Sequence, residues 1–124
     1  MVREISQKGW KTFCERLTDS CKGAMLRIEL QRTDGTKLDI ARDVALRGIR
    51  FDADSDPCNT NLIIEAGQNE PIRHIVVEPI HIRLRSNGQE ERFSLLEIMA
   101  ENGTTSALLS PGITPETLKG LEAT

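Results

Sequence analysis

The first stretch of the chain with a clear hydrophobic pattern has the spacing of an amphipathic helix. Between residues 6 and 21, apolar side chains recur every three or four positions: Trp10, Phe13, Cys14, Leu17 and Cys21. This spacing places them on one helix face. Ser6 is a candidate N-cap, and Lys22 followed by Gly23 is a typical helix end, because a cation suits the negative end of the helix dipole and glycine accepts positive φ. We expect a helix over residues 6–21 whose aromatic stripe docks on the rest of the chain.

After this helix the apolar positions alternate with polar ones, which is the pattern of a half-buried strand. The alternation runs over residues 26–30, stops at the turn-forming pair Asp34-Gly35 and resumes over 38–46, which predicts a β-hairpin. Gly48 indicates a bulge or bend, because the apolar residues after it fall on the opposite parity. The sheet is therefore expected to coil.

Two further segments continue the strand pattern. Residues 62–66 form a short apolar run that ends at Gly67. Residues 72–85 form one long segment of extended character, which contains Pro79. Proline has no N–H group to donate to a strand ladder, so we expect a bulge or a sheet edge at that position.

Turn signals divide the last part of the chain. Asn87-Gly88 precedes a predicted strand over residues 93–100. Asn102-Gly103 is the strongest hairpin signal in the sequence and leads into a predicted strand over residues 104–109. Regular strand structure is expected to end at Ser110-Pro111-Gly112, because these residues favour a turn.

The order of these elements predicts an α+β fold. One helix precedes about six short strands joined by tight turns, so it is expected to cover one face or one mouth of a strongly twisted antiparallel sheet or partial barrel. Residues 1–112 are expected to form a single compact domain. Residues 113–124 are expected to form a C-terminal tail, in which Thr114 and Pro115 begin a one-turn helix that Gly120 ends.

Composition narrows the class of protein. The chain has 124 residues and a net charge of -3 with both signs interspersed, which fits one domain and argues against bulk affinity for nucleic acid. No apolar run approaches the ~20 residues that span a bilayer, and the first residues lack the apolar core of a signal peptide, so a cytoplasmic location without membrane contact is expected. Cys14 and Cys21 are about 10 Å apart along the helix, too far for a disulfide, and they and Cys58 are expected to be reduced thiols.

Three groups of core and turn residues carry a family resemblance. They are Arg3-Glu4-Ile5 with Trp10, Phe13 and Leu17; Leu46-Arg47-Gly48-Ile49 before an acidic turn; and Leu96-Glu97-Ile98, Asn102-Gly103-Thr104-Thr105 and Pro115-Glu116-Thr117 near the end. Together they resemble a family of small uncharacterised bacterial proteins known only as a domain of unknown function. The resemblance covers nearly the whole chain and implies no catalytic residue, cofactor or ligand.

A basic stripe is the first candidate for a partner surface. His81, Arg83 and Arg85 alternate with apolar residues and are expected to face solvent together, with Arg92 nearby across a turn. Such a surface suits an acidic partner, and a helix followed by a bent antiparallel sheet is similar in element order to the Sm-type RNA-binding barrel. The scarcity of aromatic platforms argues against single-stranded nucleic acid. A solvated charged face is the plainer interpretation.

An acidic loop is the candidate for a hard cation. Asp52, Asp54 and Asp56 alternate along it, and carboxylates are ligands that calcium prefers. However, Pro57 stands where a calcium loop needs glycine, and Ile63 stands where it needs a bidentate glutamate. We therefore prefer a turn stabilised by aspartate side chains and expect no metal and no other cofactor.

Enzyme chemistry lacks a matching set of residues. Cys58 is the most accessible thiol by sequence, but Asp54 and Asp56 beside it raise a thiol pKa rather than lower it. His74 and His81 lie on opposite parities of one segment and have no zinc-site spacing. We therefore assign no catalytic residue.

These patterns favour a non-enzymatic domain that acts by binding or by self-association, with an unidentified partner. Edge strands in the segments flanking Pro79 and ending at Leu109 are candidates for pairing across a two-fold axis in a homo-oligomer. One alternative is an RNA- or acidic-partner-binding barrel that uses the face of Arg83 and Arg85. A second is a metal-dependent or thiol enzyme, which requires a deep pocket that gathers both histidines and a carboxylate.

Overall fold

The chain folds into one curled antiparallel sheet with a helix packed against it. The structure, a computed structural model, describes residues 2–53, 60–86 and 91–122. Its strands are β1 (Val2–Glu4), β2 (Met25–Arg32), β3 (Lys37–Ala53), β4 (Thr60–Ala66), β5 (Ile72–Val77), β6 (His81–Arg85), β7 (Phe93–Ala100) and β8 (Gly103–Ile113). They pair in the order β1-β6-β7-β8-β2-β3-β4-β5, and every pair is antiparallel.

The predicted α+β class is confirmed, but the prediction of about six strands is wrong, because the described residues form eight. The strand β1 has only three residues, which is too short to show a period of two. The second extra strand arises because the long predicted segment 72–85 is two strands. The sheet is curled but open, with β1 and β5 at its two ends, so it is not closed into a barrel.

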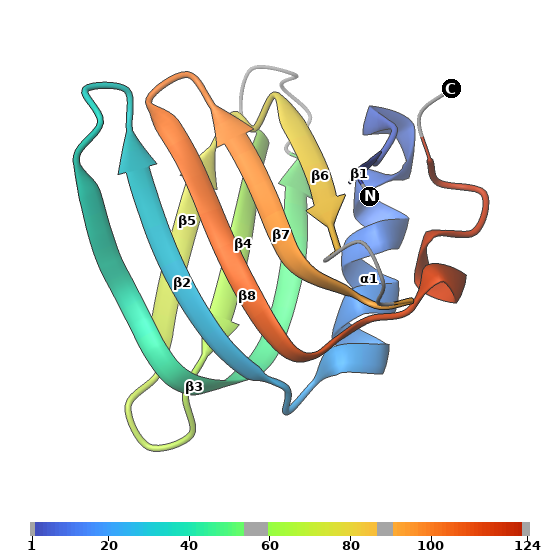
Figure 1. The fold of residues 1–124 in the computed structure, drawn as a ribbon, viewed down its shortest axis with the longest axis horizontal. Coiled ribbons are helices and arrows are strands. Elements are labelled where there is room, and N and C mark those ends of the chain that lie inside the picture. Colours follow the sequence, from blue (N-terminus) through green and yellow to red (C-terminus); the bar gives the residue numbers. More distant parts are fainter. Residues whose placement is uncertain (1, 54–59, 87–90, 123–124) are drawn as a thin grey trace.

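The long strand β3 bends, so that the sheet folds back on itself. Its first half pairs with β2 and its second half pairs with β4. The ladder with β4 shifts register between Leu46 and Gly48, which confirms the bend predicted at Gly48. Figure 1 shows the result: β2, β8, β7 and β6 form a front layer, and β4, β5 and the end of β3 form a rear layer.

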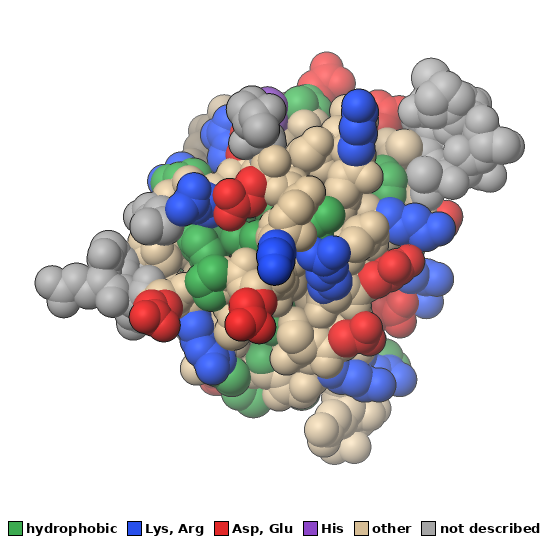
Figure 2. Space-filling view, turned by 90° about the vertical axis from the view of Figure 1, so that its right-hand side faces the viewer, with side chains coloured by type: hydrophobic (Ala, Val, Ile, Leu, Met, Phe, Trp, Pro, Cys, Tyr) green, Lys and Arg blue, Asp and Glu red, His purple; other side chains and the backbone are tan. Residues whose placement is uncertain are grey.

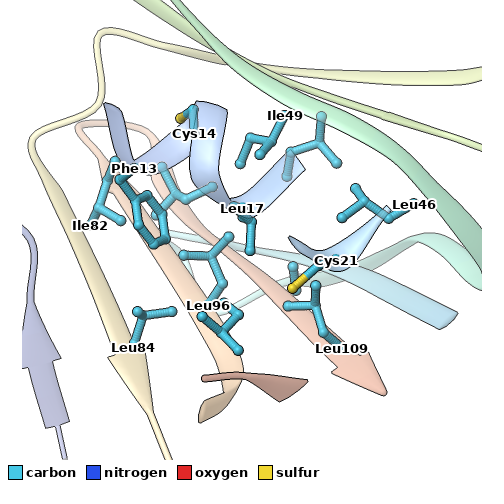
Figure 3. Close-up of a cluster of buried hydrophobic side chains, with 14 of the residues drawn as sticks. Phe13, Cys14, Leu17, Cys21, Leu46, Ile49, Ile82, Leu84, Leu96 and Leu109 are labelled. Atoms are coloured by element: carbon cyan, nitrogen blue, oxygen red, sulfur yellow. The ribbon is translucent and has the colours of Figure 1, made fainter. Parts of the chain in front are cut away.

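The helix closes one side of the space between the two layers. A 3-10 turn η1 (Gln7–Gly9) leads into α1 (Trp10–Cys21), followed by Gly23 at φ 92°. The predicted helix start at Ser6 is wrong: Ser6 precedes the 3-10 turn without a side-chain capping hydrogen bond, and Gly9 takes the N-cap position of the α-helix. All five residues of the apolar stripe are buried, which confirms that the aromatic side chains dock on the sheet. Figure 3 shows side chains of α1 meeting those of β3, β6, β7 and β8: Phe13, Cys14, Leu17 and Cys21 meet Leu46, Ile49, Ile82, Leu84, Leu96 and Leu109.

The indole of Trp10 anchors the helix through a hydrogen bond and a ring contact. Its Nε1 donates a hydrogen bond of 3.1 Å to the carbonyl oxygen of Ile5, and its ring meets the ring of Phe51 edge-on with centroids 5.6 Å apart. The polar edge is thereby paired while the apolar body is 2% exposed. Within the described residues, no helix is long and apolar enough to cross a membrane.

The segment around Pro79 crosses from one layer to the other. The N–H group of Glu78 donates to the carbonyl of Thr60 at the start of β4, whereas the N–H group of Ile80 donates to the carbonyl of Met99 of β7. Glu78 also has φ 50°, which turns the chain. The expected single segment over residues 72–85 is therefore wrong, because β5 and β6 belong to different layers. Pro79 ends one ladder rather than bulging within it.

The C-terminal part joins the same core. The strand β8 continues to Ile113, which pairs with Phe93, so the predicted end of strand structure at residues 110–112 is wrong. The expected hairpin at residues 102–103 and the one-turn helix η2 (Pro115–Leu118) are confirmed. Leu118 is fully buried, and the N–H group of Ser6 donates to the carbonyl of Leu121. Residues 113–122 therefore pack as part of the domain. The turn predicted at residues 87–88 lies outside the described residues.

Candidate functional site

The basic stripe of β6, formed by His81, Arg83 and Arg85, faces solvent, and its side chains already pair with carboxylates. Ile82 and Leu84 are fully buried, so the side chains between them point outward. Arg83 Nε lies 2.8 Å from Glu4 Oε1, and His81 Nδ1 lies 3.4 Å from the same oxygen. Glu4 reaches them because β1 pairs with β6. The hydrogen bond from Arg83 lowers the pKa of Glu4, so this carboxylate carries its charge at neutral pH.

The remaining arginine of the stripe is paired in the same way. Arg85 Nε donates to Glu97 Oε1 of β7. The arginines Arg83 and Arg85 thus face two glutamates, and the stripe has little excess positive charge to offer an acidic partner. Figure 2 shows a similar balance on the face that carries α1, where basic and acidic side chains are interspersed. Sequence reasoning missed both glutamates because they come from strands that are neighbours only in space.

Arg92 lines two hollows on the surface. It is exposed just before β7 and lines a groove of about 790 Å³ beside Met25, Leu108 and Pro111. It also lines a smaller hollow of about 320 Å³ with Lys22 at the end of α1. Neither lining contains His81, Arg83 or Arg85, so these hollows and the stripe are separate features.

The two histidines lie on opposite faces of the sheet. His74 points into the space between the layers, where its Nε2 is 2.9 Å from the hydroxyl oxygen of Thr105 on β8. Burial lowers the pKa of His74, because the charged imidazolium loses solvation there. His81 faces outward beside Glu4. The structure therefore brings no second histidine to either imidazole.

In the part of the chain that the structure describes, the cysteines and the acidic residues do not form a catalytic or metal-binding cluster. Cys14 and Cys21 are buried and free. Burial raises the pKa of Cys14 to about 12, so its thiol stays protonated. Asp52 is exposed near the end of β3, whereas Asp54, Asp56 and Cys58 lie outside the described residues. Within the described ranges, no three potential metal-ligating side chains gather.

The strand β5 ends the sheet, and among the residues that the structure describes none pairs with the outward side of its backbone. The hydrogen bond from Glu78 to Thr60 makes these two residues a hydrogen-bonded pair of the β4–β5 ladder. Such pairs alternate in antiparallel strands, so the backbone groups of residues 72, 74 and 76 face β4. Those of Arg73, Ile75 and Val77 face away from the sheet. Their side chains are on the outer face, where Ile75 is 47% and Val77 is 59% exposed.

The other free edges are better protected. The strand β1 has three residues, and the segment after it bonds to the C-terminal part through the bridge between Ile5 and Glu122. The first half of β3 has exposed charged residues, among them Asp39 and Arg42, and a positive φ at Asp43. Charges and irregular backbone discourage pairing with another strand. The strand ending at Leu109 lies between β7 and β2, so the expectation that it forms an edge is wrong.

The comparisons with known proteins agree with the resemblance in core and turn residues. A family model matches residues 1–110, which include α1, β1 to β7 and most of β8. The chain belongs to the family of unknown function DUF5335. The DUF5335 match covers the basic stripe and the edge strand β5 alike. No curated protein and no solved structure matches the chain.

Proposed function

We propose that this DUF5335 chain is a non-enzymatic interaction module that binds its partner by strand pairing along β5. The observation that carries the proposal is the outward direction of the backbone groups of Arg73, Ile75 and Val77. A strand that pairs with this edge gains main-chain hydrogen bonds, and side chains at alternate positions supply specificity. Each such bond contributes about 0.5–1.5 kcal/mol net.

The side chains of the edge add apolar contact to the backbone pairing. Ile75 stands directly opposite Ile63 of β4 in the ladder, and Val77 is its neighbour on the same outer face. Complete burial of a valine or isoleucine side chain contributes about 1.5–3 kcal/mol, and these two side chains are about half exposed in the free chain. A partner strand laid along β5 covers part of that surface.

The alternative that uses the basic stripe has less support. Glu4 and Glu97 already pair with Arg83 and Arg85, so an acidic partner has to displace two carboxylates before it can bind. Exposed ion pairs are also weakened by salt. The edge strand requires no such displacement.

A displayed library of random nonapeptides tests the proposal. We expect selected peptides to bind the wild-type chain and Ile75→Thr, but to bind Ile75→Pro at least tenfold more weakly. Proline removes the N–H group that points away from β4, so it removes no ladder bond of the folded chain. Threonine keeps that N–H group and serves as the matched control. Peptides that bind all three chains equally, or a library that yields no binder, contradict the proposal.

A further inference from the structure

We infer that the strand that pairs with β5 is β5 of a second copy of this chain, antiparallel about a two-fold axis at Ile75. The inference rests on the proposed strand pairing and names its partner. The outward-facing residues are Arg73, Ile75 and Val77, so one outward position lies two residues before Ile75 and one lies two residues after it. In the pairing, Ile75 meets Ile75 of the second copy, and Arg73 meets Val77 of the second copy. Each of the three positions then forms a hydrogen-bonded pair.

The length of β5, which lies between two flanking prolines, favours this register. Pro71 and Pro79 lie at equal distances before and after Ile75. If the two strands shift by two residues in one direction, Val77 meets Pro71 of the second copy. If they shift in the other direction, Arg73 meets Pro79. Both prolines lie outside β5, so either shift leaves two hydrogen-bonded pairs within the strand, where the symmetric register has three.

The positions of the charges favour the antiparallel arrangement. In the symmetric register the two Arg73 residues are four positions apart along the paired strands, about 14 Å at the rise of an antiparallel strand. That separation exceeds the Debye length of about 8 Å in physiological salt. In a parallel pairing in register the two guanidinium groups are neighbours. Glu65 of β4, whose Oε2 is 4.0 Å from Arg73 Nη2, offsets the charge further in each copy.

The paired edges also complete an apolar surface. The side chains of Ile63 and Ile75 are neighbours on the outer face of the sheet, where that of Ile63 is largely covered and that of Ile75 is half exposed. The two-fold axis places the Ile75 side chains of both copies in contact, flanked on either side by Ile63. Cross-strand pairs of β-branched residues stabilise such ladders. The pairing thereby joins the two curled sheets into one continuous sheet.

Disulfide cross-linking tests the register. In a Cys58→Ser background, the variants Arg73→Cys and Val77→Cys are oxidised separately and as an equal mixture. The Cα atoms of a hydrogen-bonded pair are about 5.5 Å apart, which suits a disulfide. We expect a cross-linked dimer to form at least tenfold faster in the mixture than in either variant alone, and Ile75→Cys to cross-link by itself. Equal rates in all samples, or no cross-link in any, overturn the inference.

Sedimentation of the unmodified chain separates failure of the inference from failure of the proposed function. We expect the wild type and Ile75→Thr to form a concentration-dependent dimer, and Ile75→Pro to remain monomeric with unchanged circular dichroism. A wild type that stays monomeric while nonapeptides distinguish it from Ile75→Pro overturns self-pairing and leaves strand pairing in place. A dimer that persists in both Ile75→Pro and Val77→Pro also overturns self-pairing. A monomer that binds no peptide overturns both.

Discussion

At the residue scale, His74 is a polar side chain that connects the two layers. It comes from the edge strand β5, and its Nε2 meets the hydroxyl of Thr105, which is 1% exposed. A neutral imidazole satisfies this hydroxyl and tolerates the apolar surroundings. An imidazolium in the same place loses solvation. The protonation state of His74 therefore affects how firmly β5 is held against β8.

The lowered pKa of His74 predicts a loss of stability in mild acid. An unfolded histidine has a pKa of about 6.5, so the unfolded chain binds this proton more readily than the folded chain. The stabilisation is complete above that pH and is lost as the pH falls from it through the lower pKa of the folded chain. We expect the free energy of unfolding in urea to fall more between pH 7.5 and 5 for the wild type than for His74→Gln. Identical pH dependence in both chains contradicts this role.

Gly67 sets the turn that leads into β5. It has φ 89°, and a Cβ atom added there meets the carbonyl oxygen of Glu70. Gly35 has φ 90° with no atom within 4 Å of such a Cβ, so it is a matched control that isolates the backbone strain. We expect Gly35→Ala to lower the free energy of unfolding by about 1 kcal/mol and Gly67→Ala by about 2–3 kcal/mol. Equal losses in chemical denaturation contradict the steric account.

At the scale of elements, α1 contributes much of the core that closes the space between the layers. Phe13 is fully buried beside Ile82 of β6 (Figure 3), whereas Leu108 on the outer face of β8 is 45% exposed. We expect Phe13→Ala to cost about 3–5 kcal/mol of unfolding free energy, because it leaves a cavity in the core. Leu108→Ala is the control and is expected to cost less than about 1 kcal/mol. Comparable losses in guanidinium titrations contradict the assignment of the helix to the core.

The elements that sequence reasoning predicted are those defined by neighbouring residues. The helix stripe, its end at Gly23 and the hairpin at Asn102-Gly103 each depend on a few consecutive positions. The division of residues 72–85 into two strands depends on which distant strands Glu78 and Ile80 bond to. A period of two is the same in one strand or in two, so no pattern in the sequence showed the crossing.

At the scale of the whole molecule, the candidate surfaces too were predicted only as far as neighbouring residues define them. The alternation that put His81, Arg83 and Arg85 on one face is local, but the glutamates that balance them arrive from other strands. An edge strand is likewise a property of the complete strand order. The sequence placed a candidate edge beside Pro79, and only the topology distinguishes β5, which ends the sheet, from β8, which lies inside it.

Residue-resolved amide hydrogen exchange of β5 at low and high protein concentration tests the central claim most directly. The pairing of two copies protects the N–H groups that face away from β4. We therefore expect exchange at Arg73, Ile75 and Val77 to slow at least tenfold as the concentration rises, while exchange at His74 and Val76, whose N–H groups face β4, changes far less. Exchange at the three outward positions that does not depend on concentration contradicts the claim.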